Sequence, residues 1–300
     1  MIVCVALNPA VYVDYAADRV RLGADNEIAR VRYLVSGRGL AVARLLHLFG
    51  HDVTAAGLAG GSTGELIRGA LARTGVATSF TRIGAESRRV VRVLDGTGQT
   101  TSFREPEPYI TTEELGRLAA DYRALLDGAT AVVLSGSLPA SLPAETYGSL
   151  TSYATDAGVP VILDAGGSAL ANGAARGPAL VIPDQASEAA GLVAGTASAV
   201  VLVTDRGVQA RTPDGPWLAG IAAALVAAAY RSPPAEAELD GFRVGLVAGF
   251  VPGIALGWSW PDMFRNALAL ALSATPDGDA DLAAYEALLP EVTVTRPRSD

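Results

Sequence analysis

Short apolar runs alternate with amphipathic stretches along most of the chain. Runs such as IVCVAL have the length and composition of buried strands, and the stretches between them repeat apolar residues at helical spacing. We expect strands at 2–7, 52–58, 131–135, 159–163, 179–182 and 199–203, and helices near 39–49, 63–74, 112–126, 143–157 and 186–193. This alternation predicts a mostly parallel sheet with helices on both faces, in which ligands bind beyond the carboxyl ends of the strands.

Two stretches break this rhythm, at 11–34 and 87–105, where apolar and polar residues alternate as in exposed strands. The segment DGTGQ at 95–99 predicts a hairpin turn. We interpret these stretches as a small antiparallel sheet, a lid set apart from the main sheet. The region 243–290 is predicted to be mostly helical, and we expect a single domain over 1–300.

Composition narrows the class of protein. The chain has 300 residues, of which 50% are hydrophobic and 18% charged, which suits one large α/β domain. Its net charge of −8 argues against a nucleic-acid partner, because a broad basic surface is missing. All 23 basic residues are arginine, so no side-chain amine is present for Schiff-base chemistry.

The single cysteine, Cys4, lies in the first strand-like run, which predicts a buried and inert thiol. One cysteine forms no intrachain disulfide, and we therefore expect a cytoplasmic location. The alanine-rich runs AGIAAALVAAAY and ALALALSA are too short to cross a bilayer, so no membrane partner is expected.

Six segments in order carry a family resemblance. ALNPAVYVD at 6–14, SGRGLAVARLLHLFG at 36–50, LSGSLPASLP at 134–143 and VILDAGGSAL at 161–170 resemble the PfkB, or ribokinase-like, carbohydrate kinases. The nearest branch is that of 1-phosphofructokinase and tagatose-6-phosphate kinase. VIPDQASEA and GFRVGLVAGF stand where the family has Lys-Pro-Asn with a glutamate and Gly-Ala-Gly-Asp. The resemblance covers nearly the whole chain. It implies a ribokinase-like three-layer α/β/α domain with a small β lid, and an ancestral ATP-dependent phosphorylation of a sugar phosphate.

The family's catalytic aspartate position holds Val244, and an isopropyl group accepts no proton. Loss of positioned acid–base catalysis typically costs ~10²–10⁴ in rate. Phe242 and Arg243 follow Gly241 in a turn predicted to open a helix, where their bulk would hinder a phosphate from reaching the backbone amides. Asp240 is the candidate substitute base, with helix capping as the plainer alternative. Arg243 either holds a ligand or bridges to Asp240.

Further departures concern the implied cofactors, ATP and magnesium. Asp184 keeps an oxygen ligand, but Ser187 replaces the glutamate associated with magnesium, and Glu188 on a helix would point about 100° away. The loop VLVTDRGVQA, which contains Gly207, is shorter than the family's nucleotide loop. The segment 219–230 is predicted to cover or fill the adenine pocket. These departures put ATP and magnesium binding in doubt, and no other metal site is predicted.

The resemblance implies a set of substrate-binding residues: Asn8, Asp14, Gly37, Arg38, Gly39, Arg88, Arg92, Arg104 and Ser137. Tyr12 stands at the family's sugar-binding aspartate, and Asp14, on the same strand face, is a partial replacement. The four arginines of the set are predicted to clamp a phosphate or carboxylate between lid and main domain. The alternative is that the lid arginines pair with Glu105 and Glu107.

These observations leave three hypotheses. The leading one is a 1-phosphofructokinase-like pseudokinase that binds a small anionic sugar or metabolite without efficient phosphoryl transfer. The second is an active sugar-phosphate kinase that uses Asp240 or Asp14 as its base. The third is a repurposed enzyme with non-kinase chemistry in the old sugar pocket. A homodimer through the lid is also expected, because an exposed sheet edge invites pairing.

Overall fold

The computed structural model describes residues 1–192, 199–204, 207–221, 236–275 and 278–296. The strands of its larger sheet are β1 (Ile2–Ala6), β4 (Val53–Gly60), β5 (Ala77–Ile83), β8 (Ala131–Ser135), β9 (Val161–Ala165), β10 (Leu180–Pro183), β11 (Val200–Thr204), β12 (Gly207–Thr212), β13 (Gly215–Gly220) and β14 (Thr293–Thr295). Their order is β14-β13-β12-β11-β10-β9-β8-β1-β4-β5. The pairs from β5 to β11 are parallel, and the remaining three strands add an antiparallel edge.

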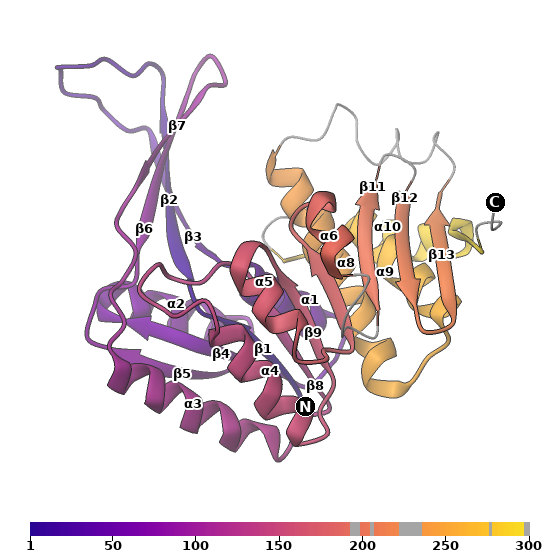
Figure 1. The fold of residues 1–300 in the computed structure, drawn as a ribbon. Coiled ribbons are helices and arrows are strands. Elements are labelled where there is room, and N and C mark those ends of the chain that lie inside the picture. The colour runs from indigo at the N-terminus through magenta and orange to yellow at the C-terminus, as the bar shows by residue number, and fades with distance from the viewer. Residues whose placement is uncertain (193–198, 205–206, 222–235, 276–277, 297–300) are drawn as a thin grey trace.

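Helices cover both faces of this sheet (Figure 1). Their bounds are α1 (Arg38–Leu48), α2 (Gly61–Arg73), α3 (Thr112–Leu126), α4 (Thr146–Asp156), α5 (Gly167–Ala174), α6 (Ala186–Leu192), α8 (Glu236–Leu256), α9 (Trp260–Ser273) and α10 (Leu282–Leu288). One apolar core includes buried residues of α1, α2, α8 and α9. A second core includes buried residues of α3, α4 and α5. The architecture is therefore the expected three-layer α/β/α arrangement.

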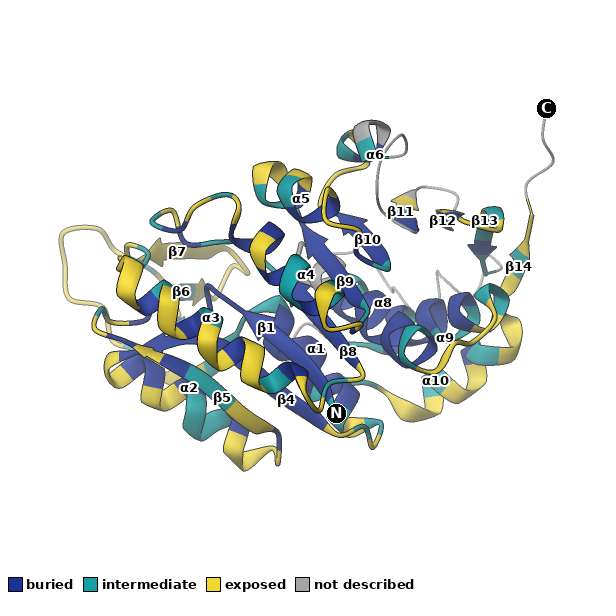
Figure 2. Ribbon diagram, turned by 60° about the horizontal axis from the view of Figure 1, so that its bottom comes forward, coloured by how far each residue is buried: buried dark blue, intermediate teal, exposed yellow. Residues whose placement is uncertain are grey.

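The central strand β1 is buried on both faces, as Figure 2 shows. Cys4 and Ala6 belong to the first core, whereas Val3 and Val5 belong to the second, because successive side chains of a strand point to opposite faces. Burial raises the pKa of the Cys4 thiol, in agreement with an inert core residue.

The smaller sheet is formed by β2 (Ala10–Ala17), β3 (Arg30–Ser36), β6 (Arg89–Asp95) and β7 (Thr100–Arg104), in the order β3-β2-β6-β7. It projects from the main body (Figure 1). The sheet is mixed, which corrects the expected antiparallel arrangement: β2 and β6 pair in parallel. The reason is that each hairpin leaves the main domain with its first strand running outward, and these two first strands are neighbours. The hairpin turn predicted at 95–99 joins β6 to β7.

The predicted elements of the main domain are confirmed to within a few residues. The helix at 112–126 and the strand at 131–135 have the predicted bounds. The α3 helix begins sharply because Thr111 and Glu114 form a capping box, each side chain accepting a hydrogen bond from the other's backbone amide. Within the described residues, no helix is both long and apolar enough to cross a membrane.

The small residues of α8 allow it to lie against α9. A Cβ atom on Gly245 would come within 2.5 Å of the Leu270 carbonyl oxygen, and one on Gly249 would overlap the backbone of Ala267. Only glycine permits this approach of two helix backbones. The small-residue run in this helix is therefore explained by packing.

Candidate functional site

A cavity of about 220 Å³ opens where strand ends of the main sheet meet the lid. It lies beyond the carboxyl ends of β1 and β8, as expected for a ligand site in a parallel sheet. Its lining is Ala6, Asn8, Ala10, Tyr12, Ser36, Gly37, Arg38, Arg88, Ser135, Gly136 and Ser137. Five of the nine residues expected to bind substrate therefore come together here: Asn8, Gly37, Arg38, Arg88 and Ser137.

Glu107 orders the polar wall of this cavity. Its Oε1 accepts hydrogen bonds from Nδ2 of Asn8 at 2.7 Å and from Arg88 at 3.4 Å. Its Oε2 accepts one from the backbone amide of Ala140 at 2.8 Å. Nδ2 of Asn8 also lies 3.3 Å from the hydroxyl of Ser137. Arg88 is thus paired within the protein through one nitrogen while it lines the cavity.

An ion-pair network lies beside the cavity and joins α1, α8 and two strand ends. Nη1 of Arg38 lies 2.5 Å from Oδ1 of Asp184 and 3.3 Å from Oδ1 of Asp164. Nη2 of Arg243 lies 2.5 Å from Oδ1 of Asp164 and 3.2 Å from Oδ1 of Asp184. The two arginines and two aspartates compensate one another's charge.

Arg243 is further anchored by the backbone. Its guanidinium donates hydrogen bonds to the carbonyl oxygens of Pro183 at 2.8 Å and Ile182 at 2.7 Å. The side chain reaches the ends of β9 and β10, because its position on α8 faces the sheet. The expected bridge to Asp240 concerns a side chain outside the described residues, and the expected ligand contact stays a prediction.

Asp164 is the buried centre of the network, and its side chain is 1% exposed. Burial alone would raise the pKa of its carboxyl group. The charges of Arg38 and Arg243, with the hydroxyl of Ser135 donating a hydrogen bond at 2.5 Å, outweigh burial and hold the pKa below its usual value. The carboxylate therefore stays ionised near neutral pH.

The acid sensitivity of the fold should depend on Asp164. The pKa of Asp164 in the folded protein lies below its value of about 3.9 in the unfolded chain. Near pH 4 the unfolded chain therefore binds more protons at this residue than the folded protein does. The stability that this group contributes is present above about pH 4 and is lost as the pH falls through the folded-state pKa. We expect urea unfolding curves of Asp164→Asn to lose less stability between pH 6 and pH 3 than those of wild type. Parallel losses in the two proteins would contradict this assignment.

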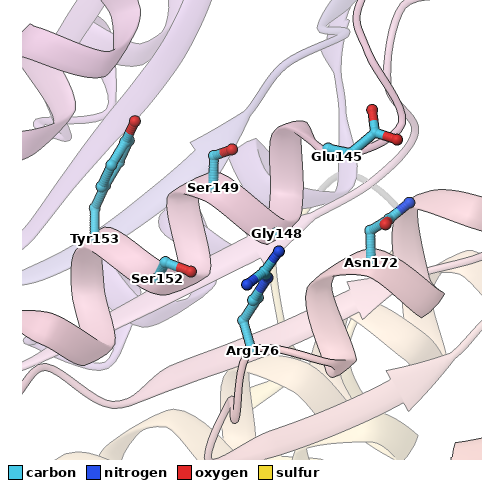
Figure 3. Close-up of a pocket in the computed structure, with 7 residues that line it drawn as sticks. All are labelled: Glu145, Gly148, Ser149, Ser152, Tyr153, Asn172 and Arg176. Carbon is cyan, nitrogen blue, oxygen red and sulfur yellow. The ribbon is translucent and has the colours of Figure 1, made fainter.

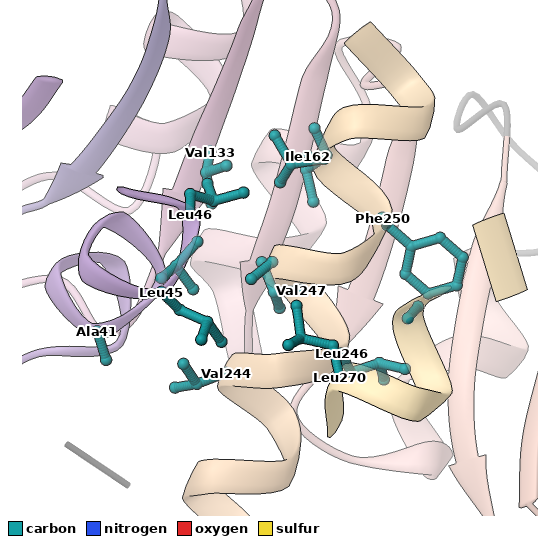
Figure 4. Packing of buried hydrophobic residues seen from close by; sticks show 14 of the residues in the cluster. Ala41, Leu45, Leu46, Val133, Ile162, Val244, Leu246, Val247, Phe250 and Leu270 are labelled. Carbon is teal, nitrogen blue, oxygen red and sulfur yellow. The ribbon is translucent and has the colours of Figure 1, made fainter. Parts of the chain in front are cut away.

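The segment Gly241–Val244 lies inside α8, which begins at Glu236. This corrects the turn predicted at the start of that helix. Inside a helix the backbone amides donate to the preceding turn, so they form no open cradle for a phosphate. Val244 is 2% exposed and belongs to the core shared by α1 and α8, where its side chain lies near Leu45 and Ala41 (Figure 4). Phe242 is half-buried against the same core.

The remaining predicted substrate residues lie outside the cavity. Asp14 accepts two hydrogen bonds from Arg92, at 2.7 and 2.8 Å, and pairs with Arg32. Arg104 is exposed on the lid strand β7. Gly39 allows α1 to approach β1, since a Cβ there would lie 2.7 Å from the carbonyl oxygen of Val5. Asp14 is therefore held by two arginines, and Gly39 has a packing role.

Several residues of the expected nucleotide site have other partners or lie outside the described residues. The carboxylate of Glu188 accepts hydrogen bonds from the amides of Gly167 and Gln185, at 2.6 and 3.0 Å. Gly207 begins β12. Most of 219–230 lies outside the described residues, and so does the side chain of Asp240. Among the described residues, no group of three or more His, Cys, Asp or Glu side chains is arranged to hold a metal ion.

A second cavity, of about 200 Å³, lies between α4 and the end of α5 (Figure 3). Its lining includes Glu145, Tyr153, Asn172 and Arg176. It contains no residue of the first cavity and none of the predicted site.

Sequence reasoning missed Asp164, Ser135 and Glu107 as site residues. A signal existed for Asp164, because a lone carboxylate at the end of the apolar run VILDA must be paired once the strand is buried. Glu107 was considered only as a partner of the lid arginines, and its ion pair with Arg88 confirms that alternative. Its contact with Asn8 had no signal in the sequence, because Glu107 lies in the irregular segment after the lid.

The family model of the "pfkB family carbohydrate kinase" matches residues 1–212 of this chain. The fold resembles a candidate phosphofructokinase from Staphylococcus aureus (TM-score 0.83, 22% identity, 98% of each chain covered). It also resembles a possible 1-phosphofructokinase from Thermotoga maritima (TM-score 0.81, 22% identity, 99% of each chain). A third similar structure is phosphofructokinase-2 from Escherichia coli in complex with fructose-6-phosphate (TM-score 0.77, 20% identity, 96% of this chain and 98% of that one). Together with the α/β/α architecture and its lid, the family match shows that the chain belongs to the pfkB family of carbohydrate kinases.

Proposed function

We propose that this protein is a pseudokinase of the 1-phosphofructokinase type, which binds a small anionic sugar or related metabolite without efficient phosphoryl transfer. The observation that carries the proposal is that the residue at the family's catalytic position, Val244, is buried inside the helix α8. Val244 is buried in the apolar core, and the neighbouring Arg243 is committed to Asp164 and Asp184. The side chain of Val244 therefore cannot accept a proton. The backbone amides around it lie inside a helix, so they do not form an open site for a phosphate group.

Retained ligand binding is supported by the cavity between the strand ends and the lid. Arg38 and Arg88 both line it, and each of these side chains is about one-fifth exposed. Both guanidinium groups are already paired with carboxylates of the protein, but each has five N–H donors and so keeps donors for the oxygens of an anionic ligand. The hydroxyl and amide groups of Ser137 and Asn8 add hydrogen-bonding partners for a sugar.

The family resemblance suggests ATP and magnesium as cofactors, but the described residues fit them poorly. Asp184 is bound by two guanidinium groups, and Glu188 accepts two backbone hydrogen bonds. A metal ion would have to displace these partners. Arg38 and Arg243 each form ion pairs with both Asp164 and Asp184. The negative charge of the two aspartates is therefore balanced without a metal ion.

Isothermal titration calorimetry tests both halves of the proposal. We expect fructose 6-phosphate, fructose 1-phosphate or tagatose 6-phosphate to bind in the absence of nucleotide and magnesium. We expect ATP with magnesium to give no heat of binding at sub-millimolar concentration. Sub-millimolar affinity for ATP with magnesium would contradict the loss of the nucleotide site, and absence of binding by all three sugar phosphates would contradict ligand binding.

The homodimer through the lid stays a prediction. It is supported by an apolar lid face on which Val31 and Phe103 are about half exposed and Tyr33 is 64% exposed. Light scattering should give twice the chain mass for the wild type. Tyr33→Asp should shift the mass toward the monomer, and a monomeric wild type at micromolar concentration would contradict the prediction.

A further inference from the structure

The cavity between α4 and α5 is lined by two side chains of opposite charge. Arg176 follows the end of α5 and rises between the two helices, and Glu145 stands at the start of α4 (Figure 3). Within the described part of the chain, neither side chain forms an ion pair or a hydrogen bond, and the two do not pair with each other. Both charges are therefore available to a ligand in this cavity.

The rest of this cavity is compact and polar. Among the described residues, the hydroxyl groups of Ser149 and Ser152 have no hydrogen-bond partner. The amide of Asn172 donates to the carbonyl oxygen of Ser168 at 2.9 Å, which leaves its own oxygen free to accept. The volume of about 200 Å³ lies below the range of about 300–1,000 Å³ that is usual for drug-sized ligands. The cavity therefore fits a small polar group.

An apolar groove lies on the other side of α4, between this helix and α3. It has a volume of about 290 Å³, and its lining is Thr112, Leu115, Gly116, Ala119, Pro143, Glu145, Thr146, Ser149, Leu150 and Tyr153. Glu145, Ser149 and Tyr153 also line the charged cavity. Their spacing of four residues places them in one row along α4, so the cavity and the groove meet at a single ridge. The guanidinium of Arg123 lies 3.8 Å from the centre of the Tyr153 ring and holds one end of this ridge in place.

We propose that this face of α4 binds a free α-amino acid with an apolar side chain. The carboxylate of the ligand pairs with Arg176, its ammonium group pairs with Glu145, and its side chain lies across the ridge in the groove. An anion without a positive group would be repelled by Glu145, and a cation without a negative group would be repelled by Arg176. The site shares no residue with the cavity beside the lid, so it goes beyond the proposed function.

Two exposed residues outside this face serve as controls. Glu113 lies on α3 beside Thr112 of the groove, and its side chain is 84% exposed. Arg73 lies in the last turn of α2, much as Arg176 lies at the end of α5. Neither control residue lines the cavity or the groove.

The experiment is isothermal titration calorimetry with L-leucine, L-methionine and L-phenylalanine, followed by two derivatives of the amino acid that binds most tightly. The amide derivative lacks the carboxylate, and the N-acetyl derivative lacks the ammonium group. In the wild type we expect a Kd of about 1 mM or lower for the parent amino acid. We expect glycine and both derivatives to bind at least about tenfold more weakly, because each of them loses one of the three contacts.

Two variants assign each charge of the ligand to its partner. Arg176→Gln should lower the preference for the parent over its amide to about twofold or less, and should keep the preference over the N-acetyl derivative. Glu145→Gln should have the reverse effect. Glu113→Gln and Arg73→Gln should keep both preferences. Because all four positions are on the surface, thermal unfolding should show that each variant is folded.

Four outcomes would overturn the proposal. The first is that none of the three amino acids binds at concentrations up to about 10 mM. The second is that both preferences survive in Arg176→Gln and in Glu145→Gln, which would place the ligand elsewhere. The third is that glycine or either derivative binds as well as the parent. The fourth is that inorganic phosphate binds as tightly as the parent and loses its binding only in Arg176→Gln, which would make this a plain anion site. None of these outcomes alters the titration with sugar phosphates, so the proposed function is tested separately.

Discussion

Val244→Asp, which introduces the family's catalytic residue, is expected to lower the free energy of unfolding by roughly 3–5 kcal/mol and to start no phosphoryl transfer. The side chain is buried in the apolar cluster that includes Ala41 and Leu45 (Figure 4), so the substitution places a charge where the described residues supply apolar contacts. An uncompensated buried charge typically costs about this much. Urea denaturation and an ADP-release assay on the same preparation measure both expectations.

A control on the same helix separates burial from charge. Leu256 lies at the end of α8 and is 69% exposed. Leu256→Asp should cost at most about 1 kcal/mol, from the interaction of a negative charge with the helix dipole. A Val244→Asp protein that is as stable as wild type and releases ADP would show that this position opens onto a working site.

Arg243→Met is the second change with a large expected effect. It removes two ion pairs and two hydrogen bonds to backbone carbonyls, and it leaves the buried Asp164 with a single guanidinium partner. Breaking a buried pair from one side typically costs about 3–5 kcal/mol, and we expect a loss in that range on urea denaturation. The double variant with Asp164→Asn should recover part of the loss, because the uncompensated charge is then absent.

The exposed pair of Arg265 and Asp262 is the matched control for this experiment. Arg265→Met should cost less than about 1 kcal/mol, as is usual for surface ion pairs. Equal small effects of Arg265→Met and Arg243→Met, with additive behaviour of the Asp164→Asn double variant, would mean that the network contributes little to the fold.

The sequence predicted six of the ten strands of the main sheet, because their signals are local, but it did not predict β5, β12, β13 and β14. The strand β5 is largely exposed and β14 has only 3 residues, so neither forms a long buried apolar run. Apolar runs, helical spacing and the capping residues before α3 lie within a few positions of the elements they define. The gathering of Asn8, Gly37, Arg38 and Ser137 was expected from the family resemblance, and it agrees with the general rule that ligands bind beyond the carboxyl ends of parallel strands.

The sequence did not predict the contacts of α8. Gly241 followed by small residues is typical of a turn that opens a helix, but here the helix starts at Glu236 and its glycines serve packing against α9. Arg243 finds its carboxylates 59 and 79 positions away, since Asp184 and Asp164 stand at the ends of other strands. Local sequence patterns do not predict contacts between residues so far apart in the chain. The hydrogen bond from Asn8 to Glu107 is another such contact.

The most direct test of the account is the rate of phosphoryl transfer from ATP with magnesium to fructose 6-phosphate, fructose 1-phosphate and tagatose 6-phosphate, followed by coupled ADP release. Kinases typically have a kcat of about 1–100 s⁻¹. We expect wild-type protein to release no ADP above the rate without sugar phosphate. Turnover within that range, lost in Asp240→Asn, would show that an aspartate four residues before Val244 acts as the base and would contradict the central claim.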